Sequence, residues 1–206
     1  NNFKYVVIGN HDLYAIKKLP KQLNGFIFPE NWYKLSIEER RELTKRKIWL
    51  YENEKLLKPL TDTEEEYLSN LPEHNIINIK EQNILLSHSV FPDITGSNFF
   101  RLHNPWELRH HFSEMMTNLI SMGFSGHMHS KYLITADKNE FKQLPYKKTN
   151  LNTKISQYFC PCIANGKEKS GLVIVDFDNY ELEAFEINNR FKIKIFSFNG
   201  KFFKKD

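Results

Sequence analysis

Three short polar clusters constrain this chain more than any other feature, because each directly follows a segment typical of a β-strand. The first follows the apolar run 3–8, the second ends the run 84–86, and the third follows the short segment 123–125. In α/β sheets, ligands bind at the edge where the carboxyl ends of the strands meet. The pattern therefore predicts an α/β fold with one polar site at such an edge. The clusters are Gly9-Asn10-His11-Asp12, Ser87-His88-Ser89 and Gly126-His127-Met128-His129.

Helix signals fall mainly in the first two thirds of the chain. Capping boxes at 36–39 and 61–64 predict two helices, the first running to about residue 57 and the second ending before Pro72. Asn104-Pro105 predicts a further helix, with Gly123 as its stop. The apolar face of that helix is predicted to comprise Leu108, Phe112, Met115, Met116 and Leu119.

Strand signals dominate the closing part of the chain, with turn signals between them at 178–179 and 188–189. No repeat and no linker divides the sequence. We therefore expect a single mixed α/β domain over residues 1–206. The predicted strands are 3–8, 76–79, 84–87, 132–135, 155–163, 171–177, 182–187 and 191–198.

Composition excludes several classes of protein. With 206 residues and 40% hydrophobic side chains, the chain can bury a full core. The net charge of +4 is carried by dispersed residues, so we expect no stable nucleic-acid partner. The longest run free of Asp, Glu, Lys and Arg, 115–130, is too short and polar to span a membrane, and no signal peptide is visible. Cys160 and Cys162 stand too close to join distant parts of a fold, which favours a reducing compartment and a cytoplasmic location.

The residue types in the clusters suit metal binding. Imidazole nitrogens and an amide oxygen are donors for first-row metals such as manganese, iron or zinc. His127 and His129 are two residues apart, so on an extended segment both rings point the same way and can reach one ion or two neighbouring ions. His11 beside Asp12 is a natural proton donor near neutral pH.

The clusters, in this order, resemble the calcineurin-like metallophosphoesterase family, which uses GNH[DE], then a lone His after an apolar strand, then GHxH. Here they are GNHD, LLSHS and GHMH. The resemblance runs from residue 3 to about 187, and the helical stretch and closing strands look like the small bacterial phosphoesterase branch. It implies a metallophosphoesterase-type β-sandwich flanked by helices. It also implies hydrolysis of a phosphate ester at a site with two divalent metal ions.

The resemblance also implies a role for each residue. Asn10, His88 and His127 would hold the second metal ion, and His129 would help hold the first. His11 would contact the phosphate and either stabilise charge or protonate the leaving oxygen. Asp12 would orient His11 and keep it protonated.

The chain departs from the family pattern at two motifs. The family begins with DxH followed by GDxxD, whereas this sequence contains neither an Asp-x-His nor a Gly-Asp pair. We therefore expect that the first strand-helix-strand unit is missing, and that 1–206 is the C-terminal part of the family fold. Three alternatives stay open: a fragment, a partner chain that supplies the missing motifs, or a non-catalytic interaction module that has lost the complete site.

Two further histidines and both cysteines are predicted to have structural roles. Cys160 and Cys162 are predicted to pack within a strand rather than bind metal. His110 and His111 are predicted to lie on the surface of the helix that starts at Pro105. The basic segments 40–47 and 201–205 are interpreted as solvated.

Overall fold

The computed structural model describes residues 3–18, 22–23, 26–27, 34–45, 59–97, 102, 104–152, 154–163 and 170–187. Within these ranges the helices are α1 (Asn10–Ala15), α2 (Ile37–Thr44), α3 (Asp62–Ser69), the 3-10 helix η3 (Pro105–Leu108) and α4 (Arg109–Thr117). The first strands are the short pair β1 (Gln22–Leu23) and β2 (Phe26–Ile27), followed by β3 (His74–Ile79), β4 (Gln82–Ser87) and β5 (Ile120–Ser125). The later strands are β6 (Leu133–Ala136), β7 (Phe141–Leu144), β8 (Lys148–Asn150), β9 (Ser156–Phe159), β10 (Ser170–Asp176) and β11 (Glu181–Ile187).

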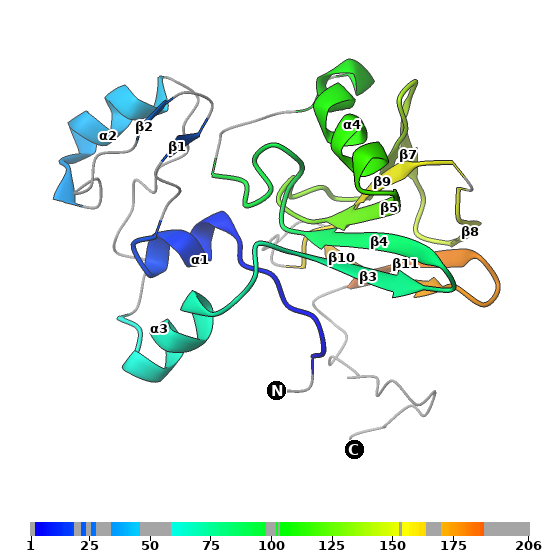
Figure 1. Cartoon of the computed structure of the whole chain (residues 1–206), viewed down its shortest axis with the longest axis horizontal. Helices are drawn as coiled ribbons and strands as arrows, with labels where there is room; N and C mark the ends of the chain where they lie inside the picture. Colours follow the sequence, from blue (N-terminus) through cyan, green and yellow to red (C-terminus); the bar gives the residue numbers. More distant parts are fainter. Residues whose placement is uncertain are drawn as a thin grey trace.

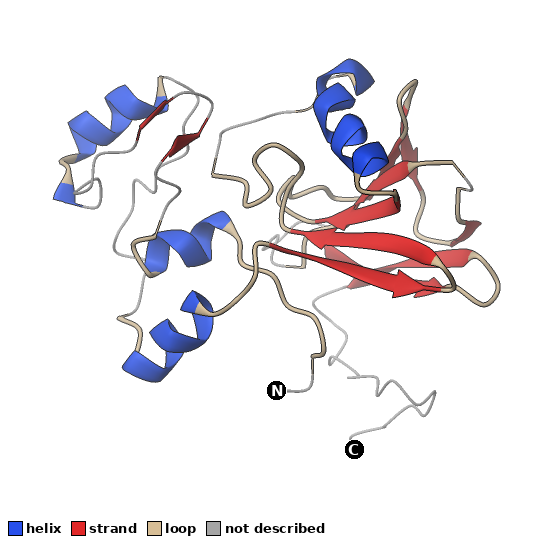
Figure 2. Cartoon of the chain, in the orientation of Figure 1, coloured by secondary structure: helices blue, strands red, loops and turns tan. Residues whose placement is uncertain are grey.

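Two sheets form the centre of the fold. The larger is six-stranded in the order β3-β4-β5-β9-β6-β7, and the smaller is three-stranded in the order β10-β11-β8. In the larger sheet β4, β5 and β9 are parallel, while β3 and β6 pair antiparallel to their neighbours. Figure 1 shows α4 over one face of the larger sheet and β10 and β11 on its other side. Figure 2 shows α1, α2 and α3 beside the sheets.

Each face of the larger sheet buries its own hydrophobic cluster. Adjacent residues of a strand point to opposite faces, and Ile84 and Leu85 on β4 accordingly belong to different clusters. Ile84 packs with residues such as Leu182 of β11, between the two sheets. Leu85 packs with Phe112 and other residues around α4. The predicted β-sandwich flanked by helices is therefore confirmed.

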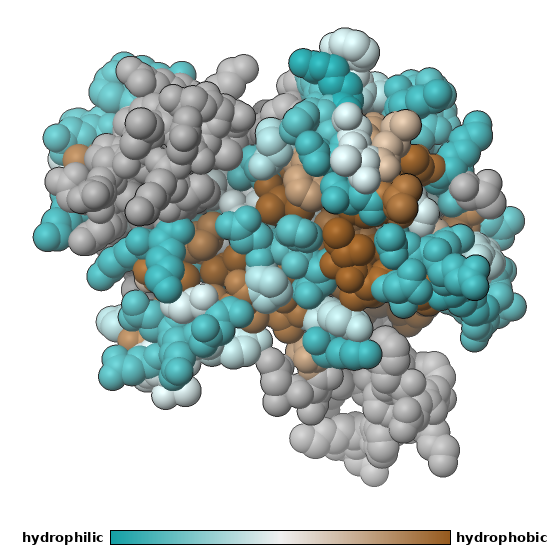
Figure 3. Space-filling model, viewed as in Figure 1, coloured by the Kyte–Doolittle hydropathy of each residue, from teal (hydrophilic) through white to brown (hydrophobic). Residues whose placement is uncertain are grey.

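The space-filling view relates this architecture to the surface. Figure 3 shows hydrophilic side chains over α1 and α3, and apolar ones along the middle of the same face, where Figure 1 draws β3 and β4. β3 is an edge strand of the larger sheet. Its Ile76 is 44% exposed, so this edge of the sheet exposes an apolar side chain.

Both predicted capping boxes are present. The Glu64 amide donates to Thr61 Oγ1, and the Glu64 carboxylate accepts from the Thr61 amide at 2.8 Å. Ser36 and Glu39 make the same reciprocal pair. α3 ends before Pro72 as predicted. The predicted continuation of the first helix, at 46–57, lies outside the described residues, as does the predicted strand 191–198.

The prediction of a strand at 3–8 is wrong. The segment pairs with none of the described strands. Its recorded hydrogen bonds go to a loop and a side chain: the Ile8 amide donates to the Pro72 carbonyl at 2.9 Å, and Asn75 Nδ2 donates to the Val6 carbonyl at 3.2 Å. Apolar, β-branched residues favour an extended backbone, but a strand also needs a neighbour that supplies a ladder of hydrogen bonds.

The prediction that the helix beginning at Pro105 ends at Gly123 is also wrong. α4 ends at Thr117, and Leu119 turns the chain with a φ of 54°. Gly123 lies inside β5, where a Cβ would stand 2.0 Å from Gln157 Oε1. The glycine therefore makes room for a neighbouring side chain rather than ending a helix. Leu119, beyond the end of the helix, is exposed, and Met116 is exposed within α4, so neither completes its apolar face.

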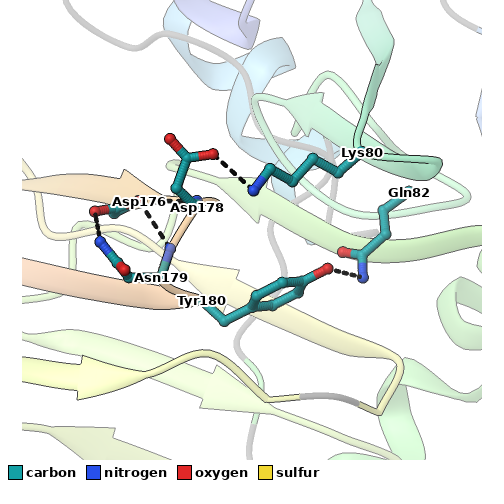
Figure 4. Close-up of polar contacts among 6 residues, drawn as sticks. All are labelled: Lys80, Gln82, Asp176, Asp178, Asn179 and Tyr180. Atoms are coloured by element: carbon teal, nitrogen blue, oxygen red, sulfur yellow. Dashed lines mark hydrogen bonds and ion pairs between the residues drawn. The ribbon is translucent and has the colours of Figure 1, made fainter.

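The two sheets also meet through their turns (Figure 4). Lys80 and Glu81 both have positive φ, as a tight β3–β4 hairpin requires. Lys80 Nζ lies 2.6 Å from Asp178 Oδ1 in the β10–β11 turn, and Gln82 Nε2 donates to Tyr180 Oη at 3.2 Å. These contacts lie at the start of β4, the opposite end of the strand from the predicted site.

Candidate metal centre

The first cluster begins a short helix. The Asp12 carboxylate accepts from the Gly9 amide at 2.9 Å and so holds the first turn of α1. Asn10, the first residue of α1, is only 2% exposed. A Cβ on Gly9 would stand 2.8 Å from His88 Nδ1, so the glycine lets the start of the helix pack directly against the His88 ring. The local sequence thus fixes Asn10 beside His88.

Three predicted ligands meet at the carboxyl ends of β4 and β5. Asn10 Oδ1 lies 3.0 Å from His88 Nε2, and His127 Nδ1 lies 3.3 Å from the same nitrogen. The two rings stand edge to face, with centroids 5.1 Å apart. The convergence of these three side chains agrees with the expected geometry, while their role as ligands stays a prediction.

The two donor separations that involve His88 Nε2 fit a shared metal ion. Donors bound at about 2.0–2.1 Å to a common ion stand roughly 2.9–3.4 Å apart in octahedral or tetrahedral coordination. The separations of 3.0 and 3.3 Å fall in this range. All three groups are neutral, however, and no group of three His, Cys, Asp or Glu side chains among the described residues is placed to hold a metal ion.

The loop that carries the third cluster is held in an unusual conformation. His127 and His129 have φ of 57° and 47°, in the left-handed region that L-residues rarely adopt. The extended segment expected here is therefore wrong. The Gly126 amide donates to the His88 carbonyl at 3.1 Å, which ties the loop to the end of β4. Strained residues of this kind concentrate at functional sites.

A second glycine, Gly96, leaves room for the His127 ring. Gly96 has a φ of 72°, and a Cβ there would stand 2.5 Å from His127 Nδ1. The turn is closed by Asp93, whose carbonyl accepts from the Gly96 amide and whose Oδ1 accepts from the Ser97 amide. The loop after β4 therefore packs its backbone onto the His127 ring.

Burial keeps the central histidines neutral. Burial, together with a smaller effect of the neighbouring histidines, lowers the pKa of both His88 and His127 to about 4. Neutral imidazole is the form that binds metal. The two rings are thus in the metal-binding state at neutral pH.

His11 differs from what we expected. Burial and the nearby His129 lower its pKa below the ordinary value, and they outweigh the Asp12 carboxylate, which raises it. The Asp12 carboxylate thus favours the protonated form of His11, in the expected direction, but burial and His129 act against it more strongly. His11 and His129 do lie close enough to His88 and His127 to lower their pKa values, so all four histidines belong to one cluster.

A buried polar network beneath the site was missed. His111, predicted to be on the surface, is fully buried. Its Nδ1 accepts from the Phe91 amide at 3.2 Å, and its Nε2–H donates to Gln157 Oε1 at 2.9 Å. Gln157 Nε2 then donates to Ser125 Oγ at 2.8 Å, at the end of β5. The available signal was Gln157, a polar residue inside a predicted strand, because buried polar groups need partners.

The cysteines stand apart from metal chemistry. Both are free thiols. Burial raises the pKa of Cys160 to about 12, and no group of three His, Cys, Asp or Glu side chains among the described residues is placed to hold a metal ion there. The Cys160 amide donates to the Ser125 carbonyl and the Cys162 amide to the Ser130 carbonyl, as expected of residues that continue from β9.

Comparison with known proteins identifies the fold. No protein-family model matches the sequence, and a search of curated proteins finds no significant match. A metallophosphoesterase from Sphaerobacter thermophilus matches 89% of this chain with a TM-score of 0.52 and 14% identity. A hypothetical protein from Pyrococcus horikoshii matches 89% with a TM-score of 0.51 and 15% identity. This chain therefore has the metallophosphoesterase fold.

The likeness to the two solved structures covers only part of their length. The chain spans 66% and 62% of the length of these two solved chains. At 14% and 15% identity the likeness concerns the fold. Among the described residues, no helix is long and apolar enough to cross a membrane.

Proposed function

We propose that this protein is a metal-dependent phosphoesterase that hydrolyses a phosphate ester at a site with two divalent metal ions. One observation carries the proposal: Asn10 Oδ1, His88 Nε2 and His127 Nδ1 converge with separations of 3.0 and 3.3 Å at the carboxyl edge of a metallophosphoesterase-type sheet. Two divalent ions, of manganese, iron or zinc, supply charge stabilisation for the phosphoryl group and a nucleophile at neutral pH.

The residues divide the work. Asn10, His88 and His127 hold one ion, and His129 helps to hold the other. His11, next to Asn10 at the start of α1, binds a phosphate oxygen or gives a proton to the leaving oxygen. Asp12 acts by positioning, because its carboxylate holds the Gly9 amide and so fixes the first turn that carries His11.

The proposal requires ligands beyond the described residues. A dication held by amide and imidazole donors alone lacks the charged ligand that binds it tightly. We infer that carboxylates come from outside the described residues, either from the rest of the protein or from a partner chain. Carboxylates from either source would complete the coordination of the ion that His129 helps to hold.

A second candidate function follows from the same neutral donor set. Because no described group of three His, Cys, Asp or Glu residues is placed to hold a metal, the domain also fits a non-catalytic interaction module on this fold. Such a module would retain the histidine cluster as a structural feature.

Nitrophenyl phosphate hydrolysis separates the two candidates. The protein is assayed with any residues that its gene encodes before Asn1, in a manganese titration. We expect manganese-stimulated hydrolysis, lost in His88→Ala at low metal and partly restored at high metal. His110→Ala, whose side chain is 54% exposed on α4, is the matched control and should behave as the native protein. Metal binding without hydrolysis would favour the interaction module.

A further inference from the structure

An apolar pocket of about 290 Å³ opens on the α4 side of the larger sheet. The side chains around it come from the loop before η3, from the third cluster, and from strands β6, β7 and β9. Five of the six lining residues are apolar, and the sixth is an amide. They are Leu102, Met128, Ile134, Phe141, Gln143 and Phe159.

The pocket adjoins the candidate metal centre by two independent routes. Met128 lies between His127 and His129 in the chain, so the loop that carries two predicted ligands also forms part of the pocket wall. Phe159 ends β9 and is paired in register with Ser125, which ends β5 two residues before His127. Both routes place the pocket at the same carboxyl edge of the sheet as the histidines.

The size and lining of the pocket indicate what it can take. A volume near 290 Å³ is at the lower limit for small-molecule sites, so it suits a ring or a short chain rather than a complete nucleotide. Aromatic and aliphatic walls favour an apolar group, and Met128 is a flexible side chain that adapts to its shape.

We propose that this pocket binds the apolar alcohol part of the substrate, so that the preferred substrate class is a phosphate ester of an alkyl or aryl alcohol of about six carbons. The proposal rests on the proposed function, because the phosphate is held by the histidine cluster. Each methylene that moves fully from water into the pocket strengthens binding about fourfold. Going from an ethyl to a hexyl group should therefore tighten binding roughly tenfold to 200-fold.

Methionine methyl NMR gives a direct readout of the pocket. The chain has four methionines. Met128 lines the pocket, while Met115 and Met122 are buried elsewhere and Met116 is 63% exposed on α4. The protein, produced with any residues that its gene encodes before Asn1, labelled on methionine methyls and supplied with diamagnetic Zn²⁺, is titrated with ethylphosphonate, hexylphosphonate and hexanol. We expect hexylphosphonate to shift the Met128 signal and to bind at least about tenfold tighter than either of the others.

Two neighbouring residues supply matched variants. Gln143 is exposed on β7 and lines the pocket, whereas Lys142 is exposed on the opposite face of the same strand. Gln143→Trp should fill the pocket and weaken hexylphosphonate binding at least about tenfold, while Lys142→Trp should leave it unchanged. Gln143→Leu keeps the pocket open and more apolar, so it should strengthen binding.

The failures of the two proposals are distinguishable. If ethylphosphonate and hexylphosphonate bind equally well and shift the His127 ring signals but not Met128, the pocket proposal is overturned and the proposed function stands. If hexanol binds as tightly as hexylphosphonate, the histidine cluster adds nothing for the phosphonate, which overturns the proposed function and the proposal that depends on it.

Discussion

Replacing Gly9 by alanine should disturb the candidate metal centre with a single methyl group. The backbone at Gly9 has a φ of −116°, which any residue adopts, so the substitution introduces no backbone strain. The new Cβ would stand 2.8, 2.9 and 3.0 Å from three atoms of the His88 ring. Because that ring also contacts Asn10 and His127 through Nε2, any displacement of it changes both contacts.

The expected magnitude follows from two effects. Overpacking a well-filled site costs typically about 1–3 kcal/mol. Alanine is also a poorer residue than glycine at a helix N-cap, which adds on the order of 0.5–1 kcal/mol. We therefore expect the free energy of unfolding of Gly9→Ala to fall by about 1.5–4 kcal/mol. We expect manganese affinity to fall at least about tenfold because the spacing of the donors changes.

Gly126→Ala is the matched control. A Cβ at Gly126 would meet nothing nearer than the His88 carbonyl oxygen, at 3.9 Å, which is ordinary contact. Urea unfolding and calorimetric manganese titration of both variants test the argument. If Gly9→Ala is as stable as Gly126→Ala and binds manganese equally well, the close packing of α1 on His88 is refuted.

Three further predictions concern the buried histidines and the ligand set. Burial lowers the pKa of His111 in the folded protein to about 4, below its ordinary value near 6.5. The unfolded chain therefore binds more protons between these pH values, and the free energy of unfolding falls as the pH drops from 6.5 to 4. In urea unfolding at pH 7 and pH 4, His111→Gln should reduce this pH-dependent loss of stability by up to roughly 3 kcal/mol, and an unchanged loss would contradict the argument. Asn10→Asp should raise calorimetric manganese affinity about tenfold, because a carboxylate is a stronger ligand than an amide; an unchanged affinity would argue against a ligand role. His11→Ala should slow nitrophenyl phosphate turnover by roughly 10²–10⁴-fold with metal still bound, and unaltered turnover would remove its proton-transfer role.

The sequence predicted the site better than it predicted the elements around it. A polar cluster that follows a strand is a pattern that can be read from a few neighbouring residues. The parallel pairing of β4 and β5 brings two such strand ends together. The convergence of Asn10, His88 and His127 was therefore accessible from local order along the chain. The left-handed turn at His127 and His129 was not, because it depends on Gly96 and the His88 carbonyl, both far away in sequence.

The errors share a physical cause, which is dependence on a distant partner. Residues 3–8 have strand composition but pair with none of the described strands. Gly123 was predicted to end a helix, yet it lies in a strand, where its lack of a side chain leaves room for the Gln157 amide of the neighbouring strand. His111 looked like a surface residue because its helix is amphipathic, whereas the Phe91 amide and Gln157 give it two buried partners. Periodicity along one segment contains no information about such contacts.

The central claim is that Asn10, His88 and His127 bind a divalent metal ion. Anomalous diffraction at the manganese absorption edge tests it, from crystals grown in millimolar Mn²⁺ of the protein with any residues that its gene encodes before Asn1. We predict an anomalous peak within bonding distance of Asn10 Oδ1, His88 Nε2 and His127 Nδ1, and its absence in crystals of His88→Ala. A peak that lies away from these three atoms, or no peak in the native crystals, would contradict the account.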